Sequence, residues 1–127
     1  MKTKTLIVIS LAVCFAISAV ILAGCKGKPK TFGQAISDKT ITPIRSIVMK
    51  PADYNDKTVT VEGKITLECS TGCWFDLQQD TAVLHIDIEP SGLAIPQKVG
   101  KIVTVQGTIK IKENNKPMLI GSGVEIK

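Results

Sequence analysis

The sequence predicts an all-β domain: a small barrel of five strands in Greek-key order, with a short helix in front of it. The first observation is an alternation of apolar and polar residues that recurs over residues 58 to 126, a period of two that is typical of half-buried strands. The second is that Gly, Pro or Asn interrupts this alternation at short intervals, as turns between strands require. Together they favour a barrel or sandwich of short strands.

The helix is expected over residues 43–49. Thr42 is an N-cap candidate, Pro43 takes the first helical position, and apolar residues follow at helical spacing up to Pro51. The first and longest strand is expected over 58–69, with Gly63 at its middle, where strands often bend or bulge. A loop at 70–72 ends in a glycine, as a hairpin loop with a left-handed residue does.

The remaining strands are expected over 74–78, 82–88, 101–111 and 117–126, with a helical turn at 91–95. Five strands whose only interior helical turn lies between the third and fourth have the order of an OB-fold, a small and partly open Greek-key barrel. A simple antiparallel sandwich or meander is the alternative. The inward parity predicts a core of Val59, Val61, Ile65, Leu67, Phe75, Leu77, Leu84, Ile86, Ile88, Val103, Val105, Ile109 and Leu119.

The N-terminus carries an export signal. Two lysines precede an apolar run from Leu6 to Ala23, and the run ends in Leu22-Ala23-Gly24-Cys25. These four residues resemble the lipobox of bacterial lipoproteins, which implies a diacylglycerol on the thiol of Cys25 and cleavage before it. We therefore expect a signal peptide over 1–24, a flexible tether over 25–41 and one domain over 42–127. A transmembrane anchor formed by the apolar run is the alternative.

Lipidation of Cys25 predicts a protein bound through its acyl chains to a cell membrane or outer membrane and facing out of the cytoplasm. The formal net charge of +5, part of which lies in the signal, is too small to indicate nucleic acid. The last hairpin has Lys110, Lys112 and Lys116 but no aromatic residue for base stacking. We interpret these lysines as an edge that charge keeps soluble and expect no nucleic-acid partner.

Cys69 and Cys73 flank the predicted hairpin loop on the same parity. An even pair of cysteines in an oxidising compartment predicts a disulfide. The alternatives are a redox-active pair and two thiolate ligands for a metal. The Cys-X3-Cys spacing differs from the Cys-X2-Cys of thioredoxin-like motifs and zinc knuckles, so no metal site is assigned.

The outward parity of the second and third strands predicts a ligand face formed by Trp74, Asp76, His85 and Asp87. An OB-fold usually takes its ligands on the face of these two strands. An aromatic plate beside carboxylates and an imidazole suits a small polar or cationic ligand, or a hard divalent metal. The alternative is a solvated face on which Trp74 shields the hairpin.

The stretch from Lys50 to Ile65 resembles the opening of bacterial OB domains classed as tRNA-anticodon-binding-like, and of small exported OB proteins and lipoproteins. Cys69-Ser70-Thr71-Gly72-Cys73-Trp74 is similar to a Cys-X3-Cys-Trp hairpin in uncharacterised exported domains. The resemblance covers residues 42 to 126 and implies the OB-fold. It implies no function, because those families are mostly unassigned, and it gives no RNA ligand to a protein outside the cytoplasm.

The function expected from the sequence is a non-catalytic binding or scaffolding module without a cofactor, whose partner is an unidentified protein or small molecule. The chain has one histidine and no phosphate loop or recognisable catalytic triad. The rival expectation is a redox or metal-handling protein that uses Cys69 and Cys73, with or without His85.

Overall fold

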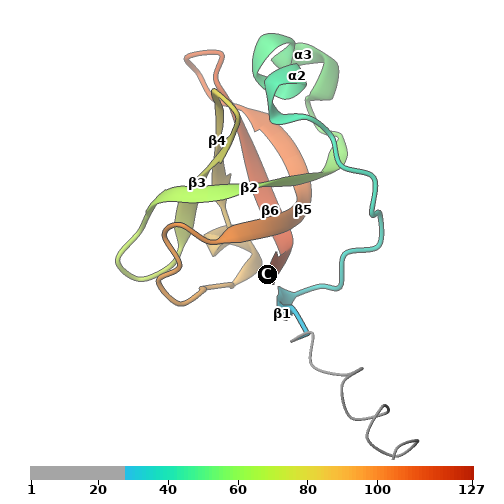
Figure 1. Cartoon of the computed structure of the whole chain (residues 1–127). Coiled ribbons are helices and arrows are strands. Elements are labelled where there is room, and N and C mark those ends of the chain that lie inside the picture. The colour runs from blue at the N-terminus through green and yellow to red at the C-terminus, as the bar shows by residue number, and fades with distance from the viewer. Residues whose placement is uncertain (1–27) are drawn as a thin grey trace, which may run out of the picture.

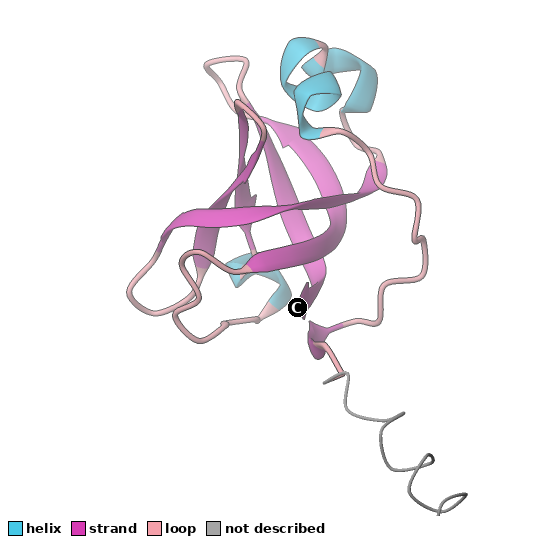
Figure 2. Cartoon of the chain, in the orientation of Figure 1, coloured by secondary structure: helices cyan, strands magenta, loops and turns pink. Residues whose placement is uncertain are grey.

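Five strands close into a barrel in the computed structural model, which describes residues 28–127 (Figures 1 and 2). The strands are β2 (Thr58–Glu68), β3 (Trp74–Gln79), β4 (Ala82–Asp87), β5 (Ile102–Ile111) and β6 (Pro117–Ile126). Strand β2 pairs with both β3 and β5, and β6 closes the barrel by pairing antiparallel with β5 and parallel with β4. This is the predicted OB-fold-like Greek-key barrel. The predicted signal peptide and the predicted lipidation site at Cys25 lie outside the described residues.

The long strand β2 is shared between the two halves of the barrel. Its first part, from Thr58 to Lys64, pairs with β5, and its second part, from Lys64 to Glu68, pairs with β3. Gly63 lies just before the changeover, where a Cβ atom would be only 2.7 Å from the carbonyl oxygen of Gln78. Only glycine allows the two backbones to approach so closely here, so the mid-strand glycine marks the place where β2 changes partners.

Two short helices, α2 (Ile44–Met49) and α3 (Pro51–Tyr54), cover one end of the barrel (Figure 1). Helix α2 forms where the sequence predicts it, but Pro43 rather than Thr42 is its N-cap residue and provides no side-chain hydrogen bond. Instead the Oε1 atom of Gln79 accepts the Ile44 N–H at 3.0 Å, while the Gln79 amide donates to the Glu62 carbonyl oxygen at 3.1 Å. A side chain of β3 thus holds the helix start against β2.

The interior helical turn lies between β4 and β5, as expected, but as a 3-10 turn over Glu89–Ser91 rather than over 91–95. Gly92 ends it in the left-handed conformation, which explains why it does not continue. Across residues 28–127 there is no helix of the length and apolar character that crossing a membrane requires.

All predicted core residues are buried except Leu67, which is 54% exposed. A bulge causes this difference: Ile65 pairs with Leu77 but Leu67 pairs with Asp76, so Thr66 is an extra residue in β2. Because side chains alternate along a strand, one extra residue moves Leu67 to the outer face. Residues outside the five strands complete the core, namely Ile44 and Ile47 of α2 and Ile95 of the loop before β5.

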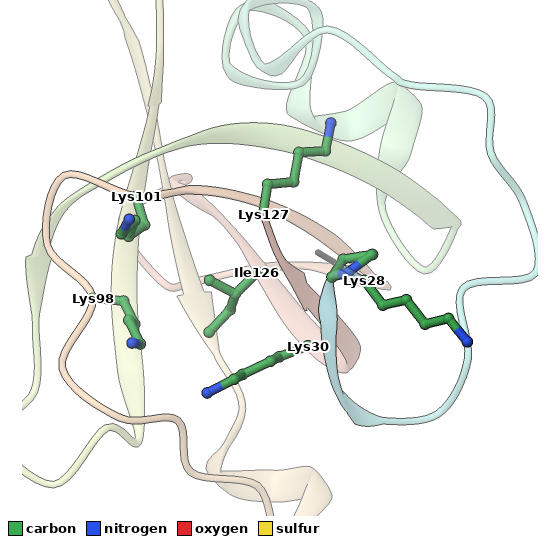
Figure 3. Close-up of a pocket in the computed structure, with 7 residues that line it drawn as sticks. Lys28, Lys30, Lys98, Lys101, Ile126 and Lys127 are labelled. Carbon is green, nitrogen blue, oxygen red and sulfur yellow. The ribbon is translucent and has the colours of Figure 1, made fainter. Parts of the chain in front are cut away.

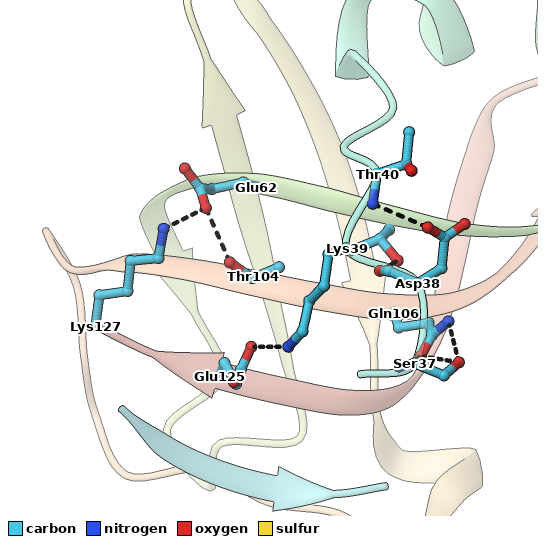
Figure 4. A network of polar contacts seen from close by, with 10 residues as sticks. Ser37, Asp38, Lys39, Thr40, Glu62, Thr104, Gln106, Glu125 and Lys127 are labelled. Atoms are coloured by element: carbon cyan, nitrogen blue, oxygen red, sulfur yellow. Dashed lines mark hydrogen bonds and ion pairs between the residues drawn. The ribbon is translucent and has the colours of Figure 1, made fainter. Parts of the chain in front are cut away.

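The expected flexible tether is wrong for the part of residues 25–41 that the structure describes. Residues Lys30–Gly33 form a strand, β1, that pairs antiparallel with the end of β6. Ile36 is buried, and the N–H of Ser37 donates to the Oε1 atom of the buried Gln106 at 3.0 Å (Figure 4). The segment therefore packs along the outside of the barrel before it reaches α2.

Candidate ligand-binding face

The four residues of the predicted ligand face lie on one surface of the β3–β4 hairpin. Trp74 is directly opposite Asp87, and Asp76 is directly opposite His85, so the expected register is correct. The rings of Trp74 and His85 lie diagonally across the strand pair with centroids 5.3 Å apart and planes inclined by 39°. All four side chains are half-buried, while the residues between them point into the core.

A short contact fixes the imidazole of His85. Its Nδ1 atom lies 2.8 Å from the Oδ1 atom of Asp76. The side chain of His85 is 31% exposed and that of Asp76 is 26% exposed. In the tautomer with the proton on Nδ1, the imidazole donates to this carboxylate and Nε2 is free to accept a hydrogen bond from a ligand. The pair therefore offers a ligand an oriented imidazole nitrogen beside a carboxylate.

A pocket of about 430 Å³ opens on this face at the helix end of the barrel. Asp76 and His85 of the β3–β4 hairpin line it together with the apolar side chains of Val48 and Val83, and Lys112 and Lys116 of the β5–β6 hairpin complete the lining. The pocket is thus lined by apolar surface, one hydrogen-bonding pair and two lysines. That combination is typical of sites for small polar ligands.

The structure divides the predicted face. Asp76 and His85 line the pocket, whereas Trp74 and Asp87 do not. The carboxylate of Asp87 accepts the N–H of Glu89 at 3.1 Å and so fixes the start of the 3-10 turn. Trp74 instead lies beside His85 at the end of β3 that adjoins Cys73.

The interpretation of the hairpin lysines as a solubilising edge missed two residues of the pocket, Lys112 and Lys116. Lys110 forms an ion pair with Asp56 and does not line the pocket. The distinction depends on how the β5–β6 hairpin folds over the barrel, and the alternation along the strands carries no signal for that. For Asp76 and His85, by contrast, the alternation of apolar and polar residues along the strands indicates that both side chains point outward.

Cys69 and Cys73 are free thiols here, both partly exposed, at the two ends of the loop between β2 and β3. The loop is narrow because the N–H of Gly72 donates to the Cys69 carbonyl oxygen at 2.9 Å, with Gly72 at φ +75°. A second bond, from the Ile95 N–H to the Gly72 carbonyl oxygen at 3.1 Å, ties the loop to the segment before β5. The expected disulfide between the two cysteines stays a prediction.

The two thiols differ in acidity. The hydrogen bond from the Cys73 thiol, followed by one from the Thr71 hydroxyl, lowers the pKa of Cys69 from 9.0 to about 6. The Thr71 oxygen lies 3.1 Å from the Cys69 sulfur. The same interaction raises the pKa of Cys73, because its proton is held against the Cys69 sulfur. Such an arrangement gives one nucleophilic thiolate beside one protonated thiol.

Among residues 28–127, no three His, Cys, Asp or Glu side chains come close enough together to hold a metal ion. His85 and Asp76 supply two ligating groups, and Cys69 and Cys73 are a separate pair on the loop before β3.

Comparison with known proteins identifies similar folds and shows nothing further. Neither the protein-family models nor the curated protein sequences give a match. Among solved structures, the chain is similar to the hypothetical protein ygiW from E. coli, with a TM-score of 0.55, 16% identity, and coverage of 76% of this chain and 99% of that one.

Two aspartyl-tRNA synthetases are also similar. The Entamoeba histolytica enzyme has a TM-score of 0.55 at 13% identity, and the putative Leishmania major Friedlin enzyme has a TM-score of 0.51 at 14% identity. They align with 82% and 75% of this chain, which spans only 27% and 22% of their own lengths. At these low identities the TM-scores show a shared OB-fold-like barrel and nothing about function.

Proposed function

We propose that this OB-fold chain is a lipid-anchored binding module outside the cytoplasm, and that its β3–β4 face takes a small polar ligand with an acidic group. The observation that carries the proposal is the pocket whose lining contains both the Asp76–His85 pair and the two lysines Lys112 and Lys116. The lysines supply positive charge for the acidic group, and His85 supplies an acceptor for a donor on the ligand.

The position of the pocket supports a binding role. It lies on the strands that OB-folds use for ligands, between those strands and the hairpin that joins the last two. Proteins similar in fold include tRNA synthetases, but single-stranded nucleic acid is usually bound by several stacking aromatic residues, and here Trp74 alone lies beside a lining residue while the lining itself contains none. The proposal therefore has no nucleic-acid partner and no catalytic step.

The anchor rests on the sequence Leu22-Ala23-Gly24-Cys25. Mass spectrometry of the mature protein tests it directly: we expect an acylated Cys25 as the first residue. A chain that retains residues 1 to 24 without acyl groups would refute the anchor.

The ligand site is tested with a panel of small carboxylic acids and the full chain. Trp74, the one tryptophan of the sequence, is 5.3 Å from His85, so ligand entry should change its emission. The double variant Lys112→Gln, Lys116→Gln should lose the binding, and the charge-matched control Lys50→Gln, Lys57→Gln, neither of which lines the pocket, should keep it. If both variants bind equally well, the lysine site is refuted. If no acid of the panel binds to the folded protein, the domain is a scaffold only.

One observation favours a second function, thiol–disulfide exchange at the Cys69–Cys73 loop: the pKa of Cys69 is lowered to about 6 by the Cys73 thiol. The Cys69 thiolate would attack a disulfide of a partner protein, and one partner sulfur would leave as a thiolate. Cys73, after losing its proton, would then form the Cys69–Cys73 disulfide and release the second partner sulfur, so the pair is oxidised as the partner is reduced. Cys73→Ser should trap the mixed disulfide, and failure to trap any partner would refute this function.

A further inference from the structure

A second pocket, of about 500 Å³, lies at the other end of the barrel from the Asp76–His85 pocket, where β1 and the end of β6 meet. Lysines dominate its lining: Lys28, Lys30, Lys98, Lys101 and Lys127, together with Pro29 and Ile126. In Figure 3 the side chains of Lys30, Lys98 and Lys101 surround Ile126, while Lys28 extends away. The pocket is therefore a basic hollow around one aliphatic residue.

The backbone around this hollow is well fixed. Lys30 pairs with Ile126 across the β1–β6 ladder. On the other side, the N–H groups of Lys98 and Val99 donate to the Oε1 atom of Glu68 at 2.7 and 2.9 Å. The Lys101 carbonyl oxygen accepts the N–H of Ile65 at 3.0 Å. Backbone hydrogen bonds and strand pairing thus bring lysines from two distant parts of the chain to the same hollow.

Positive charge at this hollow is poorly compensated. Within residues 28–127, Lys127 forms an ion pair with Glu62 at 2.6 Å, but no such pair involves Lys30, Lys98 or Lys101 (Figure 4). No Asp or Glu lines the pocket, and the sequence before Lys28 contains none. Glu68 lies at the base of the loop, where its Oε1 atom accepts two backbone N–H groups. Ammonium groups gathered in this way attract an anion such as a phosphate.

The short distance along the chain between Lys28 and Cys25 indicates the source of that phosphate. Lys28 is three residues from Cys25, so even a fully extended chain places it within about 11 Å of the lipid-bearing residue. The lining of the lysine hollow includes Lys28 and Lys30, so the hollow lies at the described part of the chain that is nearest in sequence to Cys25. This step rests on the proposed lipid anchor.

We propose that the lysine hollow binds the phosphate headgroup of an anionic membrane lipid and so orients the barrel on its membrane. The acyl chains would hold the protein at the surface, and the headgroup contact would fix which end faces the bilayer. The Asp76–His85 pocket, at the helix end of the barrel, would then point away from the membrane.

The test uses the full mature protein mixed with vesicles of phosphatidylcholine alone or of phosphatidylcholine with phosphatidylglycerol. An amine-reactive reagent labels the lysines, and peptide mass spectrometry gives the rate at each site. We expect Lys30, Lys98 and Lys101 to be labelled severalfold more slowly on the anionic vesicles. The variant Lys98→Gln, Lys101→Gln should lose the protection of Lys30, while the charge-matched Lys50→Gln, Lys57→Gln should keep it.

The other arms separate the alternatives. Protection by inorganic phosphate on neutral vesicles, without further protection by phosphatidylglycerol, would overturn the headgroup assignment. Equal labelling under all conditions would overturn the site itself. Flotation with neutral vesicles reports the acyl anchor alone, because it needs no anionic lipid, so failure of the anchor is distinguished from failure of the lysine hollow.

Discussion

The thiol of Cys69 should ionise far below the usual range, and this can be measured without knowing any partner. Its pKa is lowered from 9.0 to about 6, first by the Cys73 thiol and then by the Thr71 hydroxyl. A change from 9 to 6 raises the thiolate fraction at pH 7 from about one hundredth to about nine tenths. Since the thiolate is the nucleophile, the reduced protein should react readily at neutral pH.

The assay is alkylation of fully reduced protein with iodoacetamide across a pH series, with Cys69 and Cys73 quantified separately by peptide mass spectrometry. The rate at Cys69 should rise through a midpoint near pH 6, with the unreactive thiol below it and the thiolate above it. Cys73→Ala should move this midpoint upward by more than Thr71→Ala does, because the Cys73 thiol is the larger cause. Ser70→Ala, in the same loop, is the control and should leave it unchanged. A wild-type midpoint near 9 would refute the reasoning.

Three further predictions concern the fold, each measured against the unchanged chain. Leu67→Ala should change the free energy of unfolding by less than about 0.5 kcal/mol, whereas Leu84→Ala, in the core, should cost about 2–5 kcal/mol in urea melts; equal losses would contradict the bulge in β2. Glu68→Ala should cost about 1–3 kcal/mol, because it leaves two backbone N–H groups of the loop before β5 without their acceptor, and an unchanged melt would argue against that bond. Gln106→Ala should speed hydrogen exchange at the Ser37 amide, and unchanged protection there would show that the segment docks by other contacts.

The strands and their register could be predicted because each buries one face. Alternation between Leu84, His85 and Ile86 sets which side chains point inward, and so it also places His85 beside Asp76 on the outside. Leu67 could not be predicted correctly, since the extra residue at Thr66 inverts the parity and no pattern in the sequence marks it. The prediction of parity holds only as far as the next bulge.

The docked N-terminal segment and half of the ligand pocket escaped prediction for a different reason. Residues 30–37 attach through backbone pairing with β6 and through the side chain of Gln106, contacts that leave no apolar periodicity. Lys112 and Lys116 reach the pocket only because barrel closure brings the β5–β6 hairpin beside β4. Both features depend on residues far apart in the chain, which local patterns do not relate.

The pairing of β1 with the end of β6 also sets the order in which the chain can fold. Lys30 pairs with Ile126 and Gly33 with Gly123, so β1 has no partner until residues 123–126 have emerged during synthesis or transport. Closing so long a loop costs entropy before any contact offsets it. The N-terminal segment should therefore dock last, after the barrel has formed. Disruption of residues 123–126 would remove the pairing partner of β1 and part of that of β5 at once.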